Sequence, residues 1–215
     1  MDGYKNIKMI GYLVNCRVVF TTVHQIVMLK ADLRKHYINK RNELHGADRL
    51  KLDDLLLIQF QQINFEGIQT VLSYWPLANK SEPNTHLFNG YLRHMIPQLQ
   101  LAYPVVQDES NMQAILVNED TVYKTNQWGI TEPISGETIK LKNIHLVMVP
   151  LLVFDKAGYR VGFGKGYYDR FLAKKEEHTA LIGFSYFDPI PLISDTHEFD
   201  IPLHLGITPK RIYEF

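Results

Sequence analysis

The stretch NIHLVMVPLLVFDKAGYRVGFGKGYYDRF, residues 143–171, joins a strongly apolar run to a cluster of glycines. An apolar run of this kind is typical of a strand that is covered on both faces, as in a parallel sheet. Three glycines then alternate with Phe163 and Lys165, and the residues from Tyr168 onward indicate the start of a helix. A strand, a glycine-rich loop and a helix in this order form a framework that can hold a phosphate group.

Helical and strand patterns alternate along the rest of the chain. The sequence predicts helices over residues 29–44, 53–63 and 85–96, with Thr85 as a possible N-cap of the third. Strands are predicted over residues 70–75, 98–106, 112–118 and 179–186, and a last one within 203–215. Residues 124–137 have the composition of a loop. This alternation predicts an α/β sandwich around a mixed, largely parallel sheet.

The first predicted helix carries several cations. Its apolar residues recur at near-helical spacing, and its basic residues are predicted to lie on the other faces: Lys30, Arg34, Lys40 and Arg41. Lys30 and Arg34 are four residues apart and therefore share one face of the helix. The alternative is an ordinary solvated helix face.

Charge and cysteine content narrow the functional classes. Lys plus Arg and Asp plus Glu both number 23 in a chain of 215 residues, so net charge gives no indication of a nucleic-acid or membrane partner. The only cysteine, Cys16, cannot form an internal disulfide, which favours a reducing, cytoplasmic setting.

The first 27 residues form an apolar segment of uncertain role. Asn15, Arg17 and His24 interrupt it, so it falls short of the ~18 uninterrupted apolar residues expected of a membrane span. It also lacks the pattern of a signal peptide. We interpret residues 1–27 as an extension and residues 28–215 as one domain.

The glycine-rich stretch has the groups that a phosphate site needs. Gly162, Gly164 and Gly166 allow close backbone approach, and Lys165 adds a positive charge. Arg160 can make bidentate contacts, and Asp169 can hold a magnesium ion. The spacing fits neither G-x-x-x-x-G-K-[ST] nor G-x-G-x-x-G. The alternative is a tight structural turn whose two tyrosines pack in the core.

The wider stretch closely resembles the signature of the 5-formyltetrahydrofolate cyclo-ligase, or methenyltetrahydrofolate synthetase, family. That signature reads P-G-x-x-F-D-x-x-G-x-R-[LI]-G-x-G-x-G-Y-Y-D. The matching residues are Pro150, Phe154, Asp155, Gly158, Arg160, Gly162, Gly164, Gly166, Tyr167, Tyr168 and Asp169. KADLR (30–34), SEPNT (81–85), NQWGITEP (126–133) and FDIPLH (199–204) resemble other family motifs, so the resemblance spans residues 29–215.

The resemblance implies a Rossmann-like three-layer sandwich and an enzyme. The implied reaction is the ATP-dependent cyclisation of 5-formyltetrahydrofolate to 5,10-methenyltetrahydrofolate, with release of ADP and phosphate and with Mg²⁺ as cofactor. The implied ATP-binding residues are Lys30, Arg34, Arg160, Gly162, Gly164, Lys165, Gly166, Tyr167 and Tyr168, of which Lys165, Arg160 and Tyr168 are also expected to be catalytic.

The remaining implied roles concern the metal and the folate. Asp169 and Asp200 would hold Mg²⁺. The expected substrate-binding residues are Glu82, Trp128, Phe163 and Tyr168. Expected partners are folate and ATP alone, with no nucleic acid and no membrane, and the protein is expected to be a monomer.

Two rival functions remain open on the sequence. One is another enzyme on a similar sheet, such as a sugar-phosphate isomerase or a CoA transferase. The other is a non-catalytic folate- or nucleotide-binding protein, because Phe163 stands where many members of the family carry a basic residue.

Overall fold

The computed structural model describes residues 28–126 and 129–215. The helices are α1 (Lys30–Asn42), α2 (Gly46–Phe60), η1 (Ala78–Lys80), α3 (Thr85–Met95), η2 (Leu141–Asn143) and α4 (Tyr167–Leu172). The strands are β1 (Thr70–Leu72), β2 (Gln100–Val106), β3 (Met112–Val117), β4 (Tyr123–Thr125), β5 (Thr131–Pro133), β6 (Thr138–Ile139), β7 (Leu146–Val149), β8 (Val153–Phe154), β9 (Arg160–Val161), β10 (Ala180–Phe184), β11 (Leu205–Ile207) and β12 (Ile212–Glu214). Residues 1–27 lie outside the described part, so their status as an extension stays a prediction.

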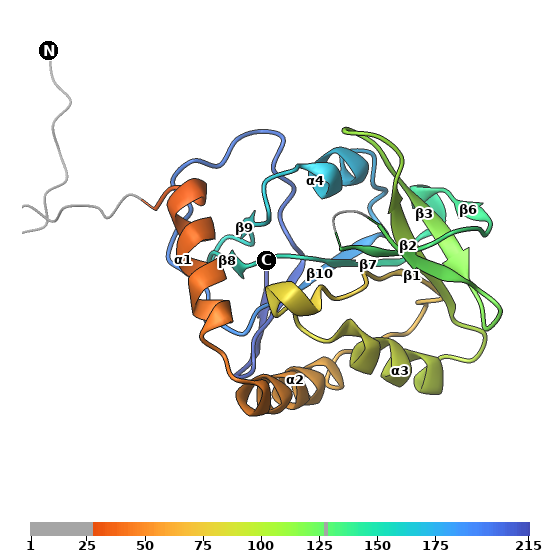
Figure 1. Cartoon of the computed structure of the whole chain (residues 1–215), viewed down its shortest axis with the longest axis horizontal. Coiled ribbons are helices and arrows are strands. Elements are labelled where there is room, and N and C mark those ends of the chain that lie inside the picture. The colour runs from red at the N-terminus through yellow and green to blue at the C-terminus, as the bar shows by residue number, and fades with distance from the viewer. Residues whose placement is uncertain (1–27, 127–128) are drawn as a thin grey trace, which may run out of the picture.

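One eight-stranded sheet forms the centre, in the order β12-β11-β10-β7-β1-β2-β3-β6. The strands from β11 to β2 run parallel to one another. Antiparallel strands complete both edges, β12 on one side and β3 with β6 on the other. The expected mixed, largely parallel sheet is therefore confirmed (Figure 1).

Helices α2 and α3 cover one face of the sheet (Figure 1). Phe60 of α2 and Phe88 of α3 are fully buried against it. Phe88 also stacks on Phe184 of β10, with ring centroids 4.1 Å apart. Aromatic pairs of this kind add stabilisation beyond their burial alone.

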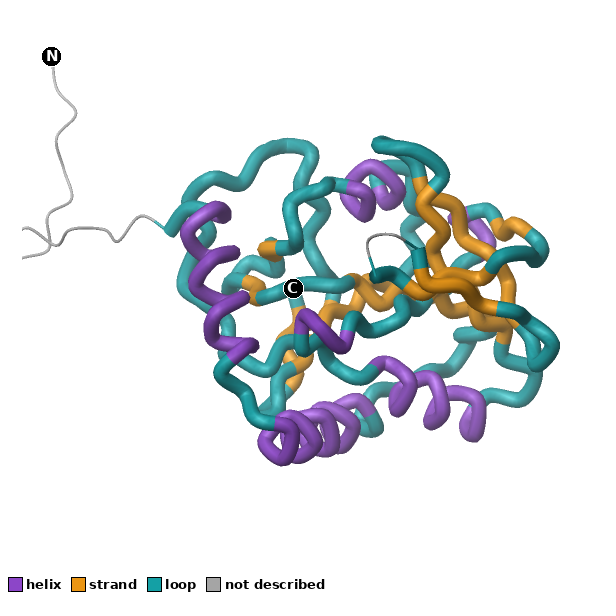
Figure 2. The backbone as a smooth tube through the Cα atoms, in the orientation of Figure 1, coloured by secondary structure: helices purple, strands orange, loops and turns teal. Residues whose placement is uncertain are grey.

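The opposite face has a thinner cover, which consists of α4 and irregular segments. Leu172 of α4 packs there with Leu151, which follows β7, and with Leu203, which precedes β11. Figure 2 shows the central strands between these two layers, so the predicted three-layer sandwich is confirmed.

Helix α1 stands at the side of the sheet and packs on the hairpin of β8 and β9 (Figure 1). Its Leu33 and Tyr37 meet Val153 and Val161 of that hairpin in a separate apolar cluster. This contact places the cationic face of α1 beside the segment that continues into the glycine-rich loop.

The apolar run 143–155 is divided into two strands, although the sequence pattern favoured one. Strand β7 ends before Pro150, and β8 then pairs antiparallel with β9. The backbone N–H of Leu152 donates to the carbonyl of Val161 at 2.8 Å. Strand β7 pairs within the central sheet, whereas β8 pairs with β9, and this change turns the chain toward α1. The apolar character of the run does not by itself indicate where the change occurs.

Two further predictions are corrected. The cap of α3 is Asn84, whose side chain accepts from the N–H of His86 at 3.2 Å, and Thr85 instead donates to the carbonyl of Tyr74 at 2.6 Å. Residues 124–137 hold a small hairpin of β4 and β5 in addition to loop. Both corrections depend on partners distant from the local sequence pattern.

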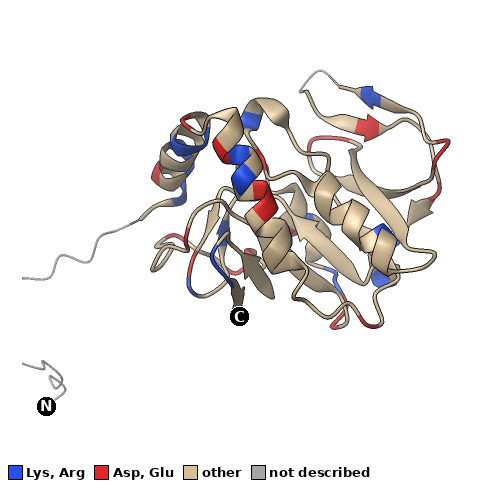
Figure 3. Ribbon diagram, turned by 90° about the horizontal axis from the view of Figure 1, so that it is seen from below, with Lys and Arg blue, Asp and Glu red and all other residues tan. Residues whose placement is uncertain are grey.

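Acidic and basic residues are interspersed along α2 (Figure 3). Its charged side chains outside the core, Asp48, Arg49, Lys51 and Asp54, therefore form no single-sign surface. Within residues 28–126 and 129–215, no helix has the length and hydropathy needed to cross a membrane.

The packing of α2 yields a matched stability test. Leu56 is 0% exposed and Leu50, on the same helix, is 66% exposed. We expect Leu56→Ala to lower the free energy of unfolding by about 2–5 kcal/mol, because it leaves a cavity. We expect Leu50→Ala to change it by less than about 0.5 kcal/mol. Urea unfolding followed by circular dichroism measures both, and equal losses would contradict the described packing.

Candidate active site

The strand order reverses between β1 and β7. The chain leaves β1 through α3 to reach β2 on one side, whereas it leaves β7 to reach β10 on the other. In open α/β sheets, ligands bind at the carboxyl ends of the strands where the order reverses. Glu82 lies on the segment that leaves β1, and the glycine-rich loop lies on the segment that leaves β7. The topology thus brings two predicted parts of the site to the same edge.

Arg34 joins helix α1 to the glycine-rich loop. Its Nε donates to the carbonyl of Gly162 at 2.9 Å. Gly164 has φ of +90°, and a Cβ there would lie 3.1 Å from Cζ of Arg34. Only a glycine accommodates both this backbone conformation and the close approach of the guanidinium. Helix α1 and the glycine-rich loop, which both carry expected ATP-binding residues, therefore meet in the structure.

The two predicted metal ligands form ion pairs near one another. Arg160 Nη2 lies 2.7 Å from Asp169 Oδ1, and Lys30 Nζ pairs with Asp200. The residue after Asp200 links the two pairs, because the N–H of Ile201 donates to Asp169 at 3.3 Å and its carbonyl accepts from Arg160. Two cations and two carboxylates thus meet at the start of α4.

The environment of Asp200 favours its ionised form. Burial acts to raise the pKa of this carboxyl, but hydrogen bonds from Lys30 Nζ and the N–H of His197 act against it, and the net pKa is lowered. The N–H of His197 donates to Asp200 at 2.8 Å. Carboxylate oxygens are the ligands that Mg²⁺ prefers, and Mg²⁺ commonly binds through one or two of them together with substrate phosphates. Asp169 and Asp200 fit that chemistry.

Glu82 lies in a buried polar cluster on the other side of the site. It is 8% exposed, and its Oε2 accepts from the N–H of Leu77 at 2.8 Å. Burial is the main influence on its pKa and raises it. The hydroxyl of Tyr168 is buried, has no protein partner, and has a pKa raised mainly by burial and further by Glu82. A polar ligand group beside Glu82 would satisfy this hydroxyl.

The other predicted residues differ in their surroundings. Lys165 is exposed. Phe163 packs against the apolar cluster between α1 and the β8–β9 hairpin. The hydroxyl of Tyr167 donates to the carbonyl of Asp108 at 3.1 Å. Gly166 adopts φ of +69° directly before α4. Trp128 lies outside the described residues.

The sequence pattern placed Arg41 with the other cations on the polar faces of the helix, and this was wrong, because Arg41 is 0% exposed. It follows the buried Leu33 and Tyr37 at steps of four residues and therefore lies on their side of α1. That spacing was the available signal, although it does not show whether a cation is buried.

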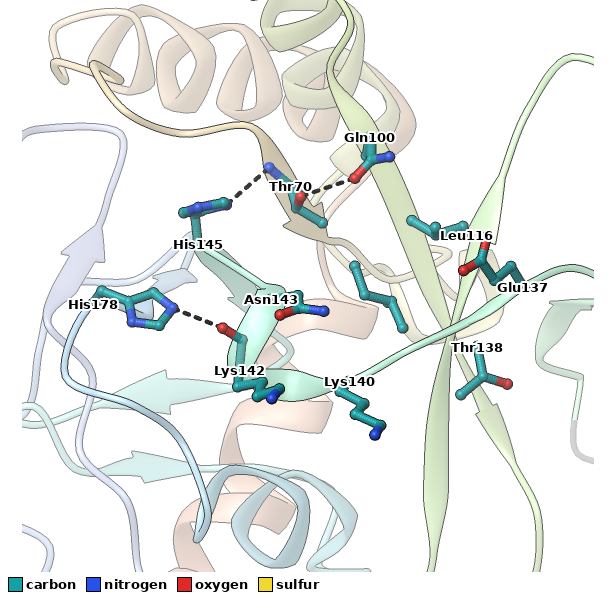
Figure 4. Close-up of a pocket in the computed structure, with 11 residues that line it drawn as sticks. Thr70, Gln100, Leu116, Glu137, Thr138, Lys140, Lys142, Asn143, His145 and His178 are labelled. Atoms are coloured by element: carbon teal, nitrogen blue, oxygen red, sulfur yellow. Dashed lines mark hydrogen bonds between the residues drawn. The ribbon is translucent and has the colours of Figure 1, made fainter.

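A hollow of about 920 Å³ lies at the opposite edge of the sheet (Figure 4). Thr70 and Gln100, at the amino ends of β1 and β2, line it together with His145 and His178. In Figure 4 His145 accepts from the backbone N–H of Thr70, a contact of 3.2 Å. None of the predicted site residues lines this hollow, and ligand sites in such sheets lie at the carboxyl ends. We therefore take the glycine-rich loop as the centre of the candidate active site.

The sequence matches the model of the 5-formyltetrahydrofolate cyclo-ligase family over residues 27–192. The chain belongs to this family. A curated 5-formyltetrahydrofolate cyclo-ligase of Mycoplasma pneumoniae is 30% identical over 187 residues, which cover 85% of this chain and 100% of that protein. The protein of that name from Mycoplasma genitalium is 27% identical and covers 81% of this chain and 95% of its own length.

Solved structures agree with this membership of the cyclo-ligase family. The NMR structure of Aquifex aeolicus 5,10-methenyltetrahydrofolate synthetase has a TM-score of 0.71 at 30% identity, and covers 87% of this chain and 93% of that one. The structure of the Mycoplasma pneumoniae 5,10-methenyltetrahydrofolate synthetase has a TM-score of 0.65 at 26% identity. The match covers 84% of this chain and 98% of that one. The predicted family, fold and enzyme class are confirmed, and the isomerase, transferase and non-catalytic alternatives are not favoured.

The contact between Gly164 and Arg34 predicts a specific defect in this cyclo-ligase. A side chain at Gly164 would strain the backbone by about 1–2 kcal/mol and displace the Arg34 guanidinium. We expect Gly164→Ala to raise the KM for ATP about tenfold or more, since small misplacements of positioning groups are costly. Gly67→Ala is the matched control, because Gly67 has φ of +81° and no atom lies within 4 Å of the place that a Cβ would take. Both variants carry a similar backbone strain, so a KM change confined to Gly164→Ala reports the Arg34 contact, and an unchanged KM in Gly164→Ala would contradict the role of this contact.

Proposed function

We propose that the protein closes 5-formyltetrahydrofolate to 5,10-methenyltetrahydrofolate at the site between α1, the glycine-rich loop and Glu82. The observation that carries the proposal is the contact of Arg34 with Gly162 and Gly164, which joins the two predicted phosphate-binding parts. Glu82 and the Tyr168 hydroxyl provide a buried polar environment beside them. One end of the site thus suits a polyphosphate, and the other suits a flat, hydrogen-bonding ring.

The chemistry requires activation of a poor leaving group. The formyl oxygen of the substrate attacks the γ-phosphorus of ATP, and ADP leaves. The N10 amine then attacks the activated formyl carbon and gives up its proton, the C–O bond breaks, and phosphate departs with the oxygen. The protein mainly positions the reactants and stabilises charge, as in other phosphoryl transfers.

Cations from three segments would hold the triphosphate. Arg34 and Lys30 come from α1, and Arg160 comes from β9. Lys165 is exposed on the loop, so it can turn toward a bound phosphate. The N–H groups of the glycine-rich loop would add hydrogen bonds to the same oxygens. Because Lys30 and Arg160 already face carboxylates, their positions are set before the nucleotide binds.

We propose that Asp169 and Asp200 hold the magnesium ion. When bound, Mg²⁺ would neutralise part of the charge on the phosphate oxygens. Arg160 and Lys30 orient these carboxylates through ion pairs. The low pKa of Asp200, where hydrogen bonds outweigh burial, keeps it ionised and ready to coordinate a cation.

At the other end, Glu82 would accept hydrogen bonds from the N–H groups of the pterin ring. Tyr168 would pack on or bond to the same ring, and Phe163 and Trp128 would supply further aromatic contact. We propose catalytic roles for Lys165, Arg160 and Tyr168, which would flank the junction between nucleotide and folate. We expect the protein to be a monomer, and the single cysteine favours a cytoplasmic setting.

The reaction itself gives the direct test. The methenyl product has a conjugated system that the substrate lacks, so its near-ultraviolet absorbance reports turnover. We expect an absorbance band that grows only when 5-formyltetrahydrofolate, ATP and Mg²⁺ are all present. Binding of both ligands without any band would overturn the proposal in favour of a non-catalytic protein, and Phe163→Arg would then test whether the missing cation is the cause.

The metal assignment makes a separate prediction. Asp169→Asn keeps a hydrogen-bond acceptor for Arg160 but removes a negative charge, so we expect the Mg²⁺ concentration for half-maximal rate to rise about 10- to 100-fold. Asp188→Asn is the control, because Asp188 forms a surface ion pair with Lys210. A titration of the initial rate with Mg²⁺ measures both. If the two variants respond alike, Asp169 is no metal ligand.

A further inference from the structure

Arg170 of α4 makes hydrogen bonds to backbone carbonyls of two separate segments. Its Nε donates to the carbonyl of Ser110 at 2.8 Å. Its Nη2 donates to the carbonyl of Glu109 at 3.4 Å and to that of Lys165 at 3.0 Å. The first two carbonyls belong to the β2–β3 loop, residues 107–111, and the third belongs to the glycine-rich loop. The Arg170 side chain therefore ties these two loops to each other.

Tyr167 reinforces this connection between α4 and the β2–β3 loop. Its hydroxyl donates to the carbonyl of Asp108 at 3.1 Å. The Arg170 guanidinium lies over the Tyr167 ring, with Cζ 5.3 Å from the ring centroid. A cation at this distance is attracted to the face of an aromatic ring. The two side chains of α4 thus hold the carbonyls of residues 108–110, and Figure 1 shows the end of the β2–β3 hairpin beside α4.

The β2–β3 loop is a firm support because its own hydrogen bonds define its shape. Asp108 Oδ1 accepts from the N–H of Ser110 at 2.8 Å and from that of Asn111 at 2.9 Å. The N–H of Gln107 donates to the carbonyl of Asn111 at 3.0 Å. An aspartate side chain that bonds to the backbone two residues later stabilises a turn. The carbonyls that Arg170 meets are therefore held in place within this loop.

Gly166 provides the space for the Arg170 guanidinium. It adopts φ of +69°, and a Cβ there would lie 2.8 Å from Nη1 of Arg170. Gly164 has the same relation to Arg34, which approaches the loop from α1. Each of these glycines allows both a positive φ and the close approach of one arginine. The glycine-rich loop is thus held by one guanidinium from α1 and another from α4.

The contact of Arg170 with the loop also sets the direction of an N–H group. A trans peptide is planar, and its N–H points away from its C=O. Because the carbonyl of Lys165 faces Arg170, the N–H of Gly166 in the same peptide group points away from that guanidinium. Within the described part of the chain, the N–H groups of residues 163–166 donate no hydrogen bond. They are therefore available to an anion.

We propose that Arg170 is a positioning residue of the nucleotide site, which holds the glycine-rich loop in the form that presents its N–H groups to the triphosphate of ATP. This inference rests on the proposed function, because it takes that loop to bind the triphosphate. A segment with three glycines has many alternative conformations, so an external support lowers the cost of ordering it when the nucleotide binds.

Substitutions of Arg170 give the first test, by initial rates with each substrate varied in turn. We expect Arg170→Met to raise the KM for ATP about tenfold or more, with little change in the KM for 5-formyltetrahydrofolate. Arg170→Lys keeps the charge but lacks the planar fork that reaches several carbonyls, so its KM for ATP should stay close to that of Arg170→Met.

Arg211→Met is the matched control for the loss of a surface arginine. Arg211 is also exposed and also lies over a tyrosine, with Cζ 4.5 Å from the centroid of the Tyr213 ring. It directly precedes β12, which forms the edge of the sheet opposite to β3 and β6. We expect Arg211→Met to leave both KM values unchanged.

A substitution in the β2–β3 loop tests whether Arg170 acts through that support. Asp108→Ala removes the acceptor of the N–H groups of Ser110 and Asn111 and leaves the side chains of α4 intact. We expect it to raise the KM for ATP in the same direction as Arg170→Met. In a double-mutant cycle, Asp108→Ala should raise this KM less in the Arg170→Met background than in the unchanged protein.

Several results would overturn the proposal. An equal rise of both KM values in Arg170→Met would show a general disturbance of the fold. Full rescue by Arg170→Lys would show that charge alone suffices, and full additivity with Asp108→Ala would show that the β2–β3 loop is no support. If Arg170→Met does not fold, an unchanged KM for ATP in Asp108→Ala would overturn the proposal.

Gly164→Ala separates this inference from the proposed function. If Gly164→Ala raises the KM for ATP and Arg170→Met leaves it unchanged, the role of Arg170 alone is refuted. If both variants leave it unchanged, the glycine-rich loop does not hold the triphosphate, and the nucleotide site of the proposed function is refuted.

Discussion

The ion pair of the buried Arg160 guanidinium with Asp169 holds the glycine-rich half of the candidate site together. Arg160 faces Asp169 in a pair whose arginine side chain is 6% exposed, and Arg41 is fully buried and donates to the carbonyl of Leu151. Removal of one partner from a buried pair leaves an uncompensated charge, which is strongly destabilising. This pair fixes α4 against β9, and the hydrogen bond of Arg41 to Leu151 ties α1 to the segment that leaves β7. The site therefore depends on charges that the fold itself must compensate.

This arrangement suits an enzyme that binds a polyanion and moves a phosphoryl group. Lys30, Arg34 and Arg160 are ordered by contacts within the protein before any ligand arrives. Preorganised cations avoid the cost of ordering long side chains at the moment of reaction. Glu82 and Tyr168 create a different environment a short distance away, where burial rather than net positive charge dominates. A nucleotide and a flat folate ring require these two environments, and the reaction requires that they meet.

The sheet explains why these segments converge. Glu82 and the glycine-rich loop are about eighty residues apart in sequence, but they leave the carboxyl ends of neighbouring strands, β1 and β7. Helix α1 is remote from both in sequence and reaches them through its apolar contact with the β8–β9 hairpin. The polar hollow in Figure 4 lies at the other edge, so its size gives no indication of where the chemistry takes place.

The sequence by itself determined the family, the alternation of helices and strands, and the identity of most candidate site residues. These features are encoded locally, by periodicity and by a long motif of glycines, tyrosines and charges. The pairing of Asp169 with Arg160 and of Asp200 with Lys30 was decided by the tertiary structure, as was the division of the run 143–155 into two strands. The tertiary structure also decided the burial of Arg41, because helical spacing defines a face of the helix but does not show what covers that face. Partners distant in sequence decide whether a charge is solvated or buried, and only the folded chain brings them together.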